Sequence, residues 1–244
     1  MVIIRTSACA RSDIGLRRSS NEDACLADSD AGCFLVADGM GGAAAGEVAS
    51  GLFVRTAADL IYSDPSRSED LAVAQVKNVF STANEAILRH VEQNPAHAGM
   101  GCTAELLLLH TGGFVLGHIG DSRTYRLRGG SLRLLTHDHS LVQQQVDQGI
   151  ISAGEARHHR MRNVILRAVG TREELAVDII RGPVLAADLF LLCTDGFSDM
   201  VDDGKIRDIL RRREPLPDKV NHCIEEAKGG GGLDNITVVL VEVL

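Results

Sequence analysis

Short runs rich in apolar residues recur along the chain and predict strands, because most are four to eight residues long and are flanked by Gly, Asp or Asn. The first, a loosely alternating stretch, predicts an edge strand. Gly129 and Gly130 predict a hairpin turn. The predicted strands cover residues 2–9, 24–27, 32–38, 103–110, 113–119, 123–127, 132–135, 164–168, 176–181, 188–194 and 235–243.

Longer stretches with apolar residues three or four apart predict helices over 43–62, from Pro65 to Asn94, over 203–213 and over 217–228. In the second of these, Ser66 and Glu69 have the spacing of a capping box. Its apolar stripe comprises Val76, Phe80, Ala83, Ile87 and Val91. Each helix has one apolar face, so we expect the helices to lie on a sheet.

The order of elements is strands, two helices, strands, two helices and one strand. This order favours an α+β fold with antiparallel sheets over a βαβ winding. We expect a two-sheet β-sandwich flanked by pairs of antiparallel helices. The 244 residues carry no break in composition, so one domain over 1–244 is expected. Residues 140–161 are more polar, and we interpret them as a flap outside the sheets.

Lys and Arg number 25 against 33 Asp and Glu, a net charge of −8 that argues against nucleic acid or an anionic membrane as partner. No apolar run approaches the ~18 residues of a membrane helix. The N-terminal residues lack the pattern of a signal peptide. We therefore expect a cytoplasmic monomer with reduced, buried thiols at its cysteines: Cys9, Cys25, Cys33, Cys102, Cys193 and Cys223.

Several apolar runs end in an aspartate. The run from Phe34 leads into Asp38, Gly39, Met40, Gly41 and Gly42, and the glycines allow a sharp turn close to a ligand. Similar runs end at Asp121 and at Asp195 followed by Gly196. Two acidic sites instead precede strands, namely Glu22 with Asp23, and Asp234 with Asn235. In an antiparallel sheet, strand ends and strand starts meet at one rim, so these acids are predicted to converge.

Taken singly, each of these aspartates could be a turn or N-cap residue; together they indicate a metal site. Two carboxylates 4 Å apart repel by about 4 kcal/mol at an effective dielectric near 20, so cations must neutralise them. An all-oxygen ligand set favours Mg²⁺ or Mn²⁺, and two such ions suit attack on phosphorus. Arg18 or Arg17 could bind the phosphate oxygens. We expect Asn235 to orient backbone instead of binding metal.

Five ordered motifs resemble the metal-dependent serine/threonine protein phosphatases of type 2C (PPM), and the bacterial branch most of all. The resemblance extends from Ser12 to Val243. The motifs are Arg18-x-x-Asn21-Glu22-Asp23, Asp38-Gly39-Met40-Gly41-Gly42, Gly120-Asp121-Ser122-Arg123, Asp195-Gly196 and Asp234-Asn235.

This resemblance implies a role for each matching residue. Asp38 would bridge two ions and the Gly39 carbonyl would bind one of them. Asp195 and Asp234 would complete the first ion site, and Glu22 and Asp23 would act around the second. Asp121, with Asp195, resembles the ligands of a third ion, although Gly-Asp-Ser-Arg could equally shape a turn. Arg18 would bind the phosphate, and residues 140–168 match the variable flap.

The resemblance also implies a reaction. A metal-bridging water or hydroxide would attack phosphoserine or phosphothreonine directly, without a phosphoenzyme. Animal members have a histidine where this chain has Met40, so no side-chain acid for the leaving group is assigned.

Partners and alternatives follow from the same resemblance. The substrates would be phosphorylated proteins, either the substrates of a serine/threonine kinase or the kinase itself. The segment from Asp138 to Val142 is similar to the subgroup that opposes the kinase controlling type VI secretion. One alternative is a catalytically weak module of the same fold that binds phosphoproteins. Another is a metal-dependent phosphodiesterase or nuclease, which the acidic charge disfavours.

Overall fold

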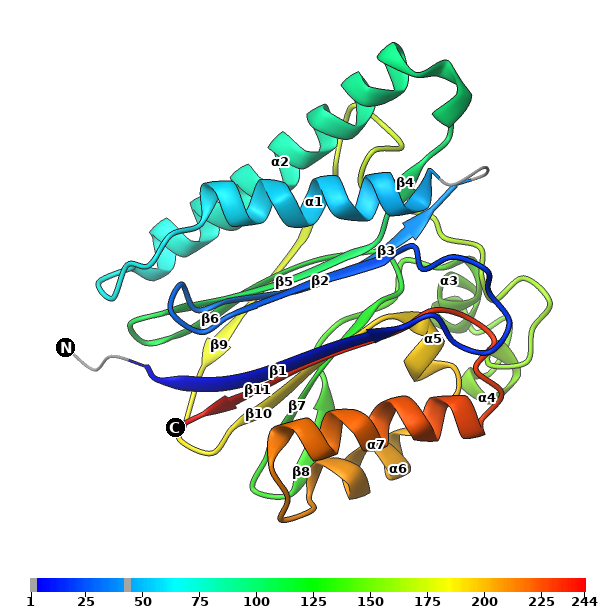
Figure 1. The fold of residues 1–244 in the computed structure, drawn as a ribbon. Helices are drawn as coiled ribbons and strands as arrows, with labels where there is room; N and C mark the ends of the chain where they lie inside the picture. The colour runs from blue at the N-terminus through cyan, green and yellow to red at the C-terminus, as the bar shows by residue number, and fades with distance from the viewer. Residues whose placement is uncertain (1–3, 42–44) are drawn as a thin grey trace.

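The computed structural model describes residues 4–41 and 45–244, and its strands form two sheets packed face to face (Figure 1). One sheet has the order β1-β11-β10-β7-β8, and the other has the order β2-β3-β5-β6-β9, with β4 paired to β3. Neighbouring strands are antiparallel, which confirms the predicted sandwich. The strands are β1 (Thr6–Asp13), β2 (Asp23–Asp28), β3 (Cys33–Met40), β4 (Gly101–Cys102), β5 (Ala104–His110), β6 (Gly113–Ile119), β7 (Arg123–Arg128), β8 (Ser131–Leu134), β9 (Asp178–Pro183), β10 (Leu189–Cys193) and β11 (Ile236–Val243).

A pair of helices covers each outer face of the sandwich, as the sequence predicts (Figure 1). Helices α1 (Gly46–Leu60) and α2 (Glu69–Gln93) lie on the sheet that contains β3, whereas α6 (Asp203–Leu210) and α7 (Leu216–Gly229) lie on the other sheet. The remaining helical segments are short: η1 (Pro95–His97), α3 (Leu141–Asp147), α4 (Ala153–Ala156) and α5 (Asp195–Ser198).

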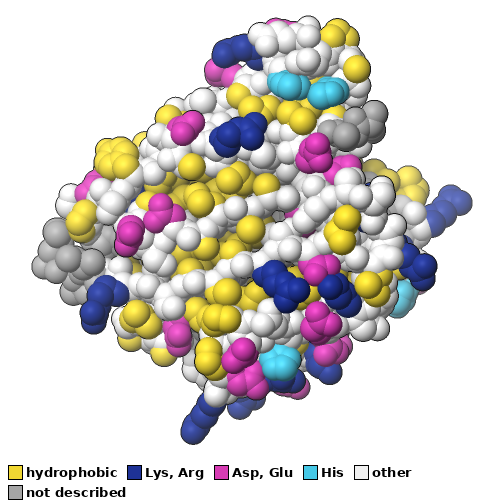
Figure 2. Space-filling model, in the orientation of Figure 1, with side chains coloured by type: hydrophobic (Ala, Val, Ile, Leu, Met, Phe, Trp, Pro, Cys, Tyr) yellow, Lys and Arg dark blue, Asp and Glu magenta, His cyan; other side chains and the backbone are white. Residues whose placement is uncertain are grey.

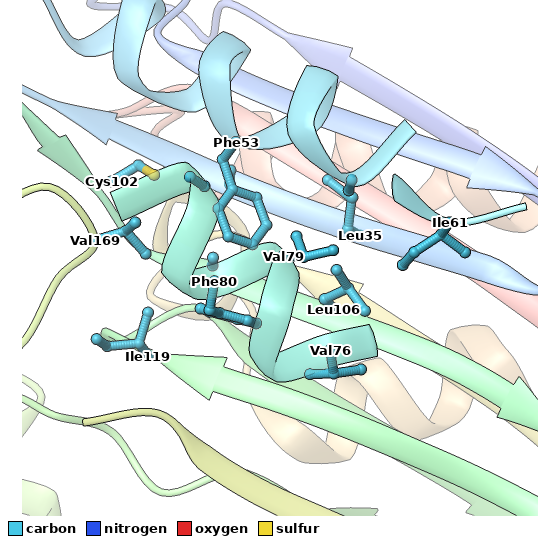
Figure 3. Packing of buried hydrophobic residues seen from close by; sticks show 14 of the residues in the cluster. Leu35, Phe53, Ile61, Val76, Val79, Phe80, Cys102, Leu106, Ile119 and Val169 are labelled. Atoms are coloured by element: carbon cyan, nitrogen blue, oxygen red, sulfur yellow. The ribbon is translucent and has the colours of Figure 1, made fainter. Parts of the chain in front are cut away.

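The layer between α1, α2 and their sheet is a dense apolar core (Figure 3). Phe53 of α1 meets Phe80 of α2 edge to face, with ring centroids 4.9 Å apart. Gly117 of β6 lies beneath this pair, and a Cβ atom there would come within 2.5 Å of the Phe80 ring. The sheet therefore needs a residue without a side chain at this position to let α2 pack closely.

A second apolar layer joins the two sheets. Phe114 of β6 and Phe190 of β10 face each other across it, with ring centroids 5.2 Å apart. Phe34, Val36, Leu107 and Val239 belong to the same buried cluster. Aliphatic and aromatic packing from both inner faces thus fixes how the strand ends of one sheet lie against those of the other.

The face shown in Figure 2 carries acidic and basic side chains side by side, around hydrophobic side chains over the middle of the molecule. Basic residues therefore do not gather into a broad patch on this face. Within residues 4–41 and 45–244, no helix has the length and apolar character needed to cross a bilayer.

Two predicted boundaries at the N-terminal side are wrong. The edge strand expected over 2–9 is β1, which runs from Thr6 to Asp13 because it pairs along its whole length with β11. The capping box expected at Ser66 does not form. Ser66 instead donates its hydroxyl to Asp64 at 2.7 Å, and Ser68 caps α2 by accepting from the Leu71 amide at 3.2 Å.

The strand predicted over 164–168 is also wrong. This segment forms only an isolated bridge between Ile165 and Ser140, because it belongs to the flap, which carries α3 and α4 and lies outside the two sheets. The helix predicted to start at residue 43 starts at Gly46. Gly42, for which the sequence predicts a tight turn, lies outside the described residues.

Candidate metal and phosphate site

Asp38 and Asp23 occupy facing positions on β3 and β2. Asp38 lies near the end of its strand, and Asp23 is the first residue of its own. Thr103 holds Asp38 from the other side, because the Asp38 amide donates to the Thr103 hydroxyl at 3.3 Å and the Asp38 carbonyl accepts from the Thr103 amide at 2.9 Å. The sheet therefore fixes both carboxylates at one edge of the sandwich.

Asp195 and Asp234 come to the same edge from the other sheet. Asp195 begins α5 directly after β10, and Asp234 lies two residues before the neighbouring β11. Gly196 makes this approach possible, since a Cβ atom there would lie 2.0 Å from the Asn235 carbonyl oxygen. The charge of Asp195 contributes to raising the pKa of Asp38, so the two carboxylates lie close together. The two sheets thus contribute carboxylates to one cluster.

Asp121 lies in the turn between β6 and β7, where only 7% of its surface is exposed. Asp121 lines one cavity together with Asp195, Asp138 and Asp199, and flap residues line the other side of this cavity. The structure therefore brings Asp121 together with the four other aspartates that the sequence singles out.

Glu22 and Gly39 bring the start of α1 against the same cluster. The Glu22 carbonyl accepts from the Gly39 amide at 3.1 Å. A Cβ atom on Gly39 would lie 2.1 Å from the Gly46 carbonyl oxygen, and one on Gly46 would lie 2.1 Å from Glu22 Oε2. Both positions therefore require glycine for backbone and side chain to approach so closely, and the Glu22 carboxylate lies at the positive end of a long helix.

The crowding of these carboxylates raises their pKa values. Burial, followed by the charges of Asp23 and Asp195, raises the pKa of Asp38 well above its ordinary value. Burial likewise raises the pKa of Asp121. The pKa of Asp23 and that of Asp195 rise to about 7, again chiefly through burial. Charged carboxylates therefore repel one another here until a proton or a cation compensates them.

Several carboxylate oxygens of the cluster lack partners. Among the described residues, Asp23 Oδ1, Asp121 Oδ1 and Asp195 Oδ1 are buried without a hydrogen bond. Buried acceptors without a donor are costly, and an all-oxygen donor set matches the preference of Mg²⁺ and Mn²⁺. The residues present therefore fit divalent cations of this kind.

As the side chains stand, no three acidic, histidine or cysteine groups in the described part of the chain surround one point as a formed metal site would. The Asp234 carboxylate is instead paired with Arg18. A cation bound at Asp234 would compete with this ion pair.

Arg18 lies at the solvent edge of the cluster. Its side chain is 51% exposed, and its Nη2 donates to Asp234 Oδ2 at 2.6 Å. It borders a cavity of about 210 Å³ that also exposes Asp195, Asp234 and Arg162. Arg18 is thus placed to meet an anion that enters this cavity, and a guanidinium can hold two phosphate oxygens at once.

Asn235 orients backbone, as the sequence predicts. Its side-chain amide donates to the carbonyls of Ile14 and Ser20 at 3.0 and 2.9 Å, and its Oδ1 accepts from the Glu22 amide at 2.8 Å. The segment that carries Arg18 and Glu22 is thereby fixed next to Asp234.

Three other charged side chains of the site, those of Asp138, Arg162 and Asp199, were not predicted from the sequence. Asp199 lies one helical turn after Asp195 and accepts from Arg162 of the flap at 3.4 Å. Asp138 accepts two hydrogen bonds from the Arg123 Nε and one from its Nη2. These residues line a second cavity of about 210 Å³, between α3, α4 and the cluster. The spacing of Asp199 from Asp195 was a usable signal, whereas no local pattern marks Arg162.

The chain belongs to the protein phosphatase 2C family, whose sequence pattern matches residues 16–225. It is 42% identical over 235 residues to the serine/threonine protein phosphatase PstP of Mycobacterium tuberculosis, which covers 96% of this chain but 44% of PstP. The chain thus spans less than half the length of that relative. The serine/threonine phosphatase Stp of Listeria welshimeri is 36% identical over 243 residues, covering 95% of this chain and 94% of Stp.

Solved structures of this family have the same fold. The catalytic domain of PstP in complex with two manganese ions superposes with a TM-score of 0.90 at 39% identity, covering 99% of both chains. PppA, described as a key regulatory component of the type VI secretion system in Pseudomonas aeruginosa, superposes with a TM-score of 0.88 at 34% identity, covering 98% of both chains.

Proposed function

We propose that this chain is a metal-dependent phosphatase that removes phosphate from phosphoserine and phosphothreonine in proteins. The observation that carries the proposal is the cluster of Asp23, Asp38, Asp121, Asp195 and Asp234, which has unpartnered buried oxygens and an exposed arginine at its edge. Membership of the protein phosphatase 2C family supports the same activity.

The cluster would hold two Mn²⁺ or Mg²⁺ ions, with a third near Asp121. We assign Asp38 to both core ions, and the Gly39 carbonyl, Asp195 and Asp234 to the first. Glu22 and Asp23 would act around the second. The ions supply the Lewis acidity and the activation of water that in-line attack on phosphorus needs.

Arg18 has the role of binding and orienting the phosphate. It is now paired with Asp234, so a phosphate that enters the cavity competes with this carboxylate for the guanidinium. Asp234, if it held an ion, would attract Arg18 less strongly, which would leave the guanidinium available to a phosphate. Met40 follows Gly39 at the end of β3 and offers no ionisable group, so the proposal assigns no side-chain proton donor to the leaving group.

The substrates that we propose are proteins phosphorylated by a serine/threonine kinase, or the kinase itself. The chain is similar to PppA, but its identity to PstP is higher, so the likeness to PppA does not favour a role in type VI secretion. We therefore propose a class of substrate and not a particular pathway.

The test measures hydrolysis of a phosphothreonine peptide with Mn²⁺, with EDTA, and by Asp38→Asn and Asp195→Asn. Asp30→Asn, in the exposed turn between β2 and β3, is the matched control. Activity that requires Mn²⁺, persists in the control and collapses in both cluster variants is the expected result. A folded wild type without turnover at any Mn²⁺ or Mg²⁺ concentration would instead indicate a phosphoprotein-binding module. Turnover of a phosphodiester alone would indicate a nuclease or phosphodiesterase.

A further inference from the structure

A charged pair lies buried in the sandwich close to the turn that carries Asp121. Glu105 of β5 and His118 of β6 face each other in the strand register, and both side chains are fully buried. Burying such a pair is costly, and a pair of apolar residues would usually stabilise a core at least as well. Fold stability alone therefore does not explain why the core contains the Glu105–His118 pair.

The Glu105 carboxylate holds both sides of the Asp121 turn. One oxygen contacts His118 Nδ1, and the other accepts from the Thr124 hydroxyl at 2.7 Å. His118 lies three residues before Asp121, and Thr124 lies three residues after it. These two partners also belong to different sheets, because β6 and β7 do. The buried Glu105 carboxylate thus contacts both strands that flank the Asp121 turn, β6 and β7.

Further contacts extend from this carboxylate to the turn itself. His118 Nε2 donates to the His137 carbonyl at 2.9 Å, and the Gly120 amide donates to His139 Nδ1 at 3.2 Å. The hydroxyls of Ser122 and Thr103 lie 2.7 Å apart, and Thr103 also holds Asp38. The turn is therefore anchored on every side while the Asp121 carboxylate itself stays free of a protein donor at Oδ1.

We infer that Glu105 is a positioning residue: by holding His118 and Thr124, it fixes the Asp121 turn so that the Asp121 carboxylate faces Asp195. The inference rests on the proposed function in that it concerns the acid assigned to the third ion. Residues that orient the ligands of a metal site commonly change metal affinity or activity by about 10–100-fold when they are removed.

The choice of variants follows from the hydrogen bonds. Glu105→Ala removes both contacts. Glu105→Gln can keep both contacts with a neutral His118, because its amide then donates to the unprotonated Nδ1 while its carbonyl accepts from Thr124. The matched control is Asp188→Ala, which removes another buried carboxylate. Asp188 directly precedes β10 and accepts from Arg128, at the far end of β7, at 2.6 and 2.5 Å.

The first readout needs neither metal nor substrate. Hydrogen exchange of the Gly120–Ser122 amides in metal-free protein is expected to be faster in Glu105→Ala than in wild type, Glu105→Gln or Asp188→Ala. Equal exchange in Glu105→Ala and wild type would overturn the inference. So would equal acceleration in Asp188→Ala, since the effect would then be a general loss of stability.

The second readout is a double-mutant cycle with Asp121→Asn on Mn²⁺-dependent turnover of a phosphothreonine peptide. We expect Glu105→Ala to lower kcat/KM by on the order of 10-fold alone and by less than about 2-fold in the Asp121→Asn background. Equal losses in both backgrounds, or no loss from Asp121→Asn, would overturn the inference. Failure of the proposed function is distinct, because it would leave wild type inactive while the exchange result still stood.

Discussion

Asp23 and Asp38 lie directly opposite each other on neighbouring antiparallel strands. Like charges in facing positions of a sheet destabilise it, and here burial adds to their repulsion. The structure tolerates the pair because it lies among hydroxyl donors, with Thr194 donating to Asp23 Oδ2 at 2.9 Å. A pair that weakens the fold in the absence of cations is the arrangement expected of a functional site.

Removing one of these charges should therefore stabilise the metal-free protein. We expect Asp38→Asn to raise the free energy of unfolding by up to about 1 kcal/mol, the upper range for a facing like-charged pair. For a chain of this length that corresponds to a rise in Tm of about 2–4 °C, measured by calorimetry in EDTA. Asp30→Asn, in the exposed turn, should leave Tm unchanged. A lower Tm for Asp38→Asn would mean that the carboxylate stabilises the fold.

The neighbouring rings of His118 and His139, whose centroids are 4.6 Å apart and whose planes are tilted by 35°, should have widely separated pKa values. Burial disfavours the charge of His118, yet the Glu105 carboxylate outweighs it and raises the pKa of His118 to about 9. Burial, with the neighbouring charges of His118 and Arg167, lowers the pKa of His139 to about 4. In NMR titrations, His118 should stay protonated past pH 8 and His139 should stay neutral at pH 5.

These pKa values also predict how stability varies with pH. An unfolded histidine titrates near 6.5, so the native state keeps a proton on His118 that the unfolded state loses, and this stability disappears between about pH 6.5 and 9. For His139 the unfolded state takes up the extra proton, so stability falls as pH drops from about 6.5 toward 4. Urea unfolding from pH 5 to 9 measures how the free energy of unfolding changes in both pH ranges. His139→Gln should reduce the change below about pH 6.5 and leave the change above it unaltered.

Gly117→Ala should affect stability without affecting chemistry. The new methyl group would lie 2.5 Å from Phe80 and 2.6 Å from Val76, so α2 must shift away from the sheet. Overpacking of this kind costs about 1–3 kcal/mol. We expect a lower midpoint in urea and an unchanged Mn²⁺ requirement. Gly129→Ala is a poor control because its φ is positive, whereas Gly229→Ala, with no atom within 4 Å of the added Cβ, is suitable.

The sequence predicted the layers and most strands because most strands coincide with an apolar run of strand length. It misplaced the ends of elements where tertiary contacts determine the boundary. β1 extends to Asp13 because β11 offers a partner for every residue, and Ser68 caps α2 because Asp64 takes the Ser66 hydroxyl. Residues 164–168 have the composition of a strand but lie in the flap, where only Ile165 forms a bridge, with Ser140.

The acidic positions of the site could be predicted because each one follows or precedes an apolar run. The charged groups around them could not. Arg162 reaches Asp199 from the flap, and Arg123 of β7 reaches Asp138 in the loop after β8, so neither contact leaves a local pattern. Glu105 precedes four consecutive leucines in β5, and only the strand register reveals that it faces His118.

The last prediction separates Arg18 from Arg17, two candidates that sequence alone left open. Arg18 pairs with Asp234 at 2.6 Å, and its side chain is half exposed. Exposed ion pairs stabilise proteins by about 0–1 kcal/mol, so Arg18→Met should change Tm little. We expect Arg18→Met to lower kcat/KM for a phosphothreonine peptide by on the order of 100-fold. Arg18→Lys should recover part of this loss, because it keeps the charge but cannot make the bidentate contact with phosphate.

Arg17→Met is the matched control and should stay within about 2-fold of wild type, as expected of a surface substitution away from the site. Calorimetric Mn²⁺ binding adds a readout that does not depend on turnover. Because Arg18→Met frees the Asp234 carboxylate, Mn²⁺ should bind this variant at least as tightly as it binds wild type. A large loss in Arg17→Met with none in Arg18→Met would assign the phosphate contact to Arg17. Weaker Mn²⁺ binding by Arg18→Met would show that the arginine supports the acidic cluster instead of competing for it.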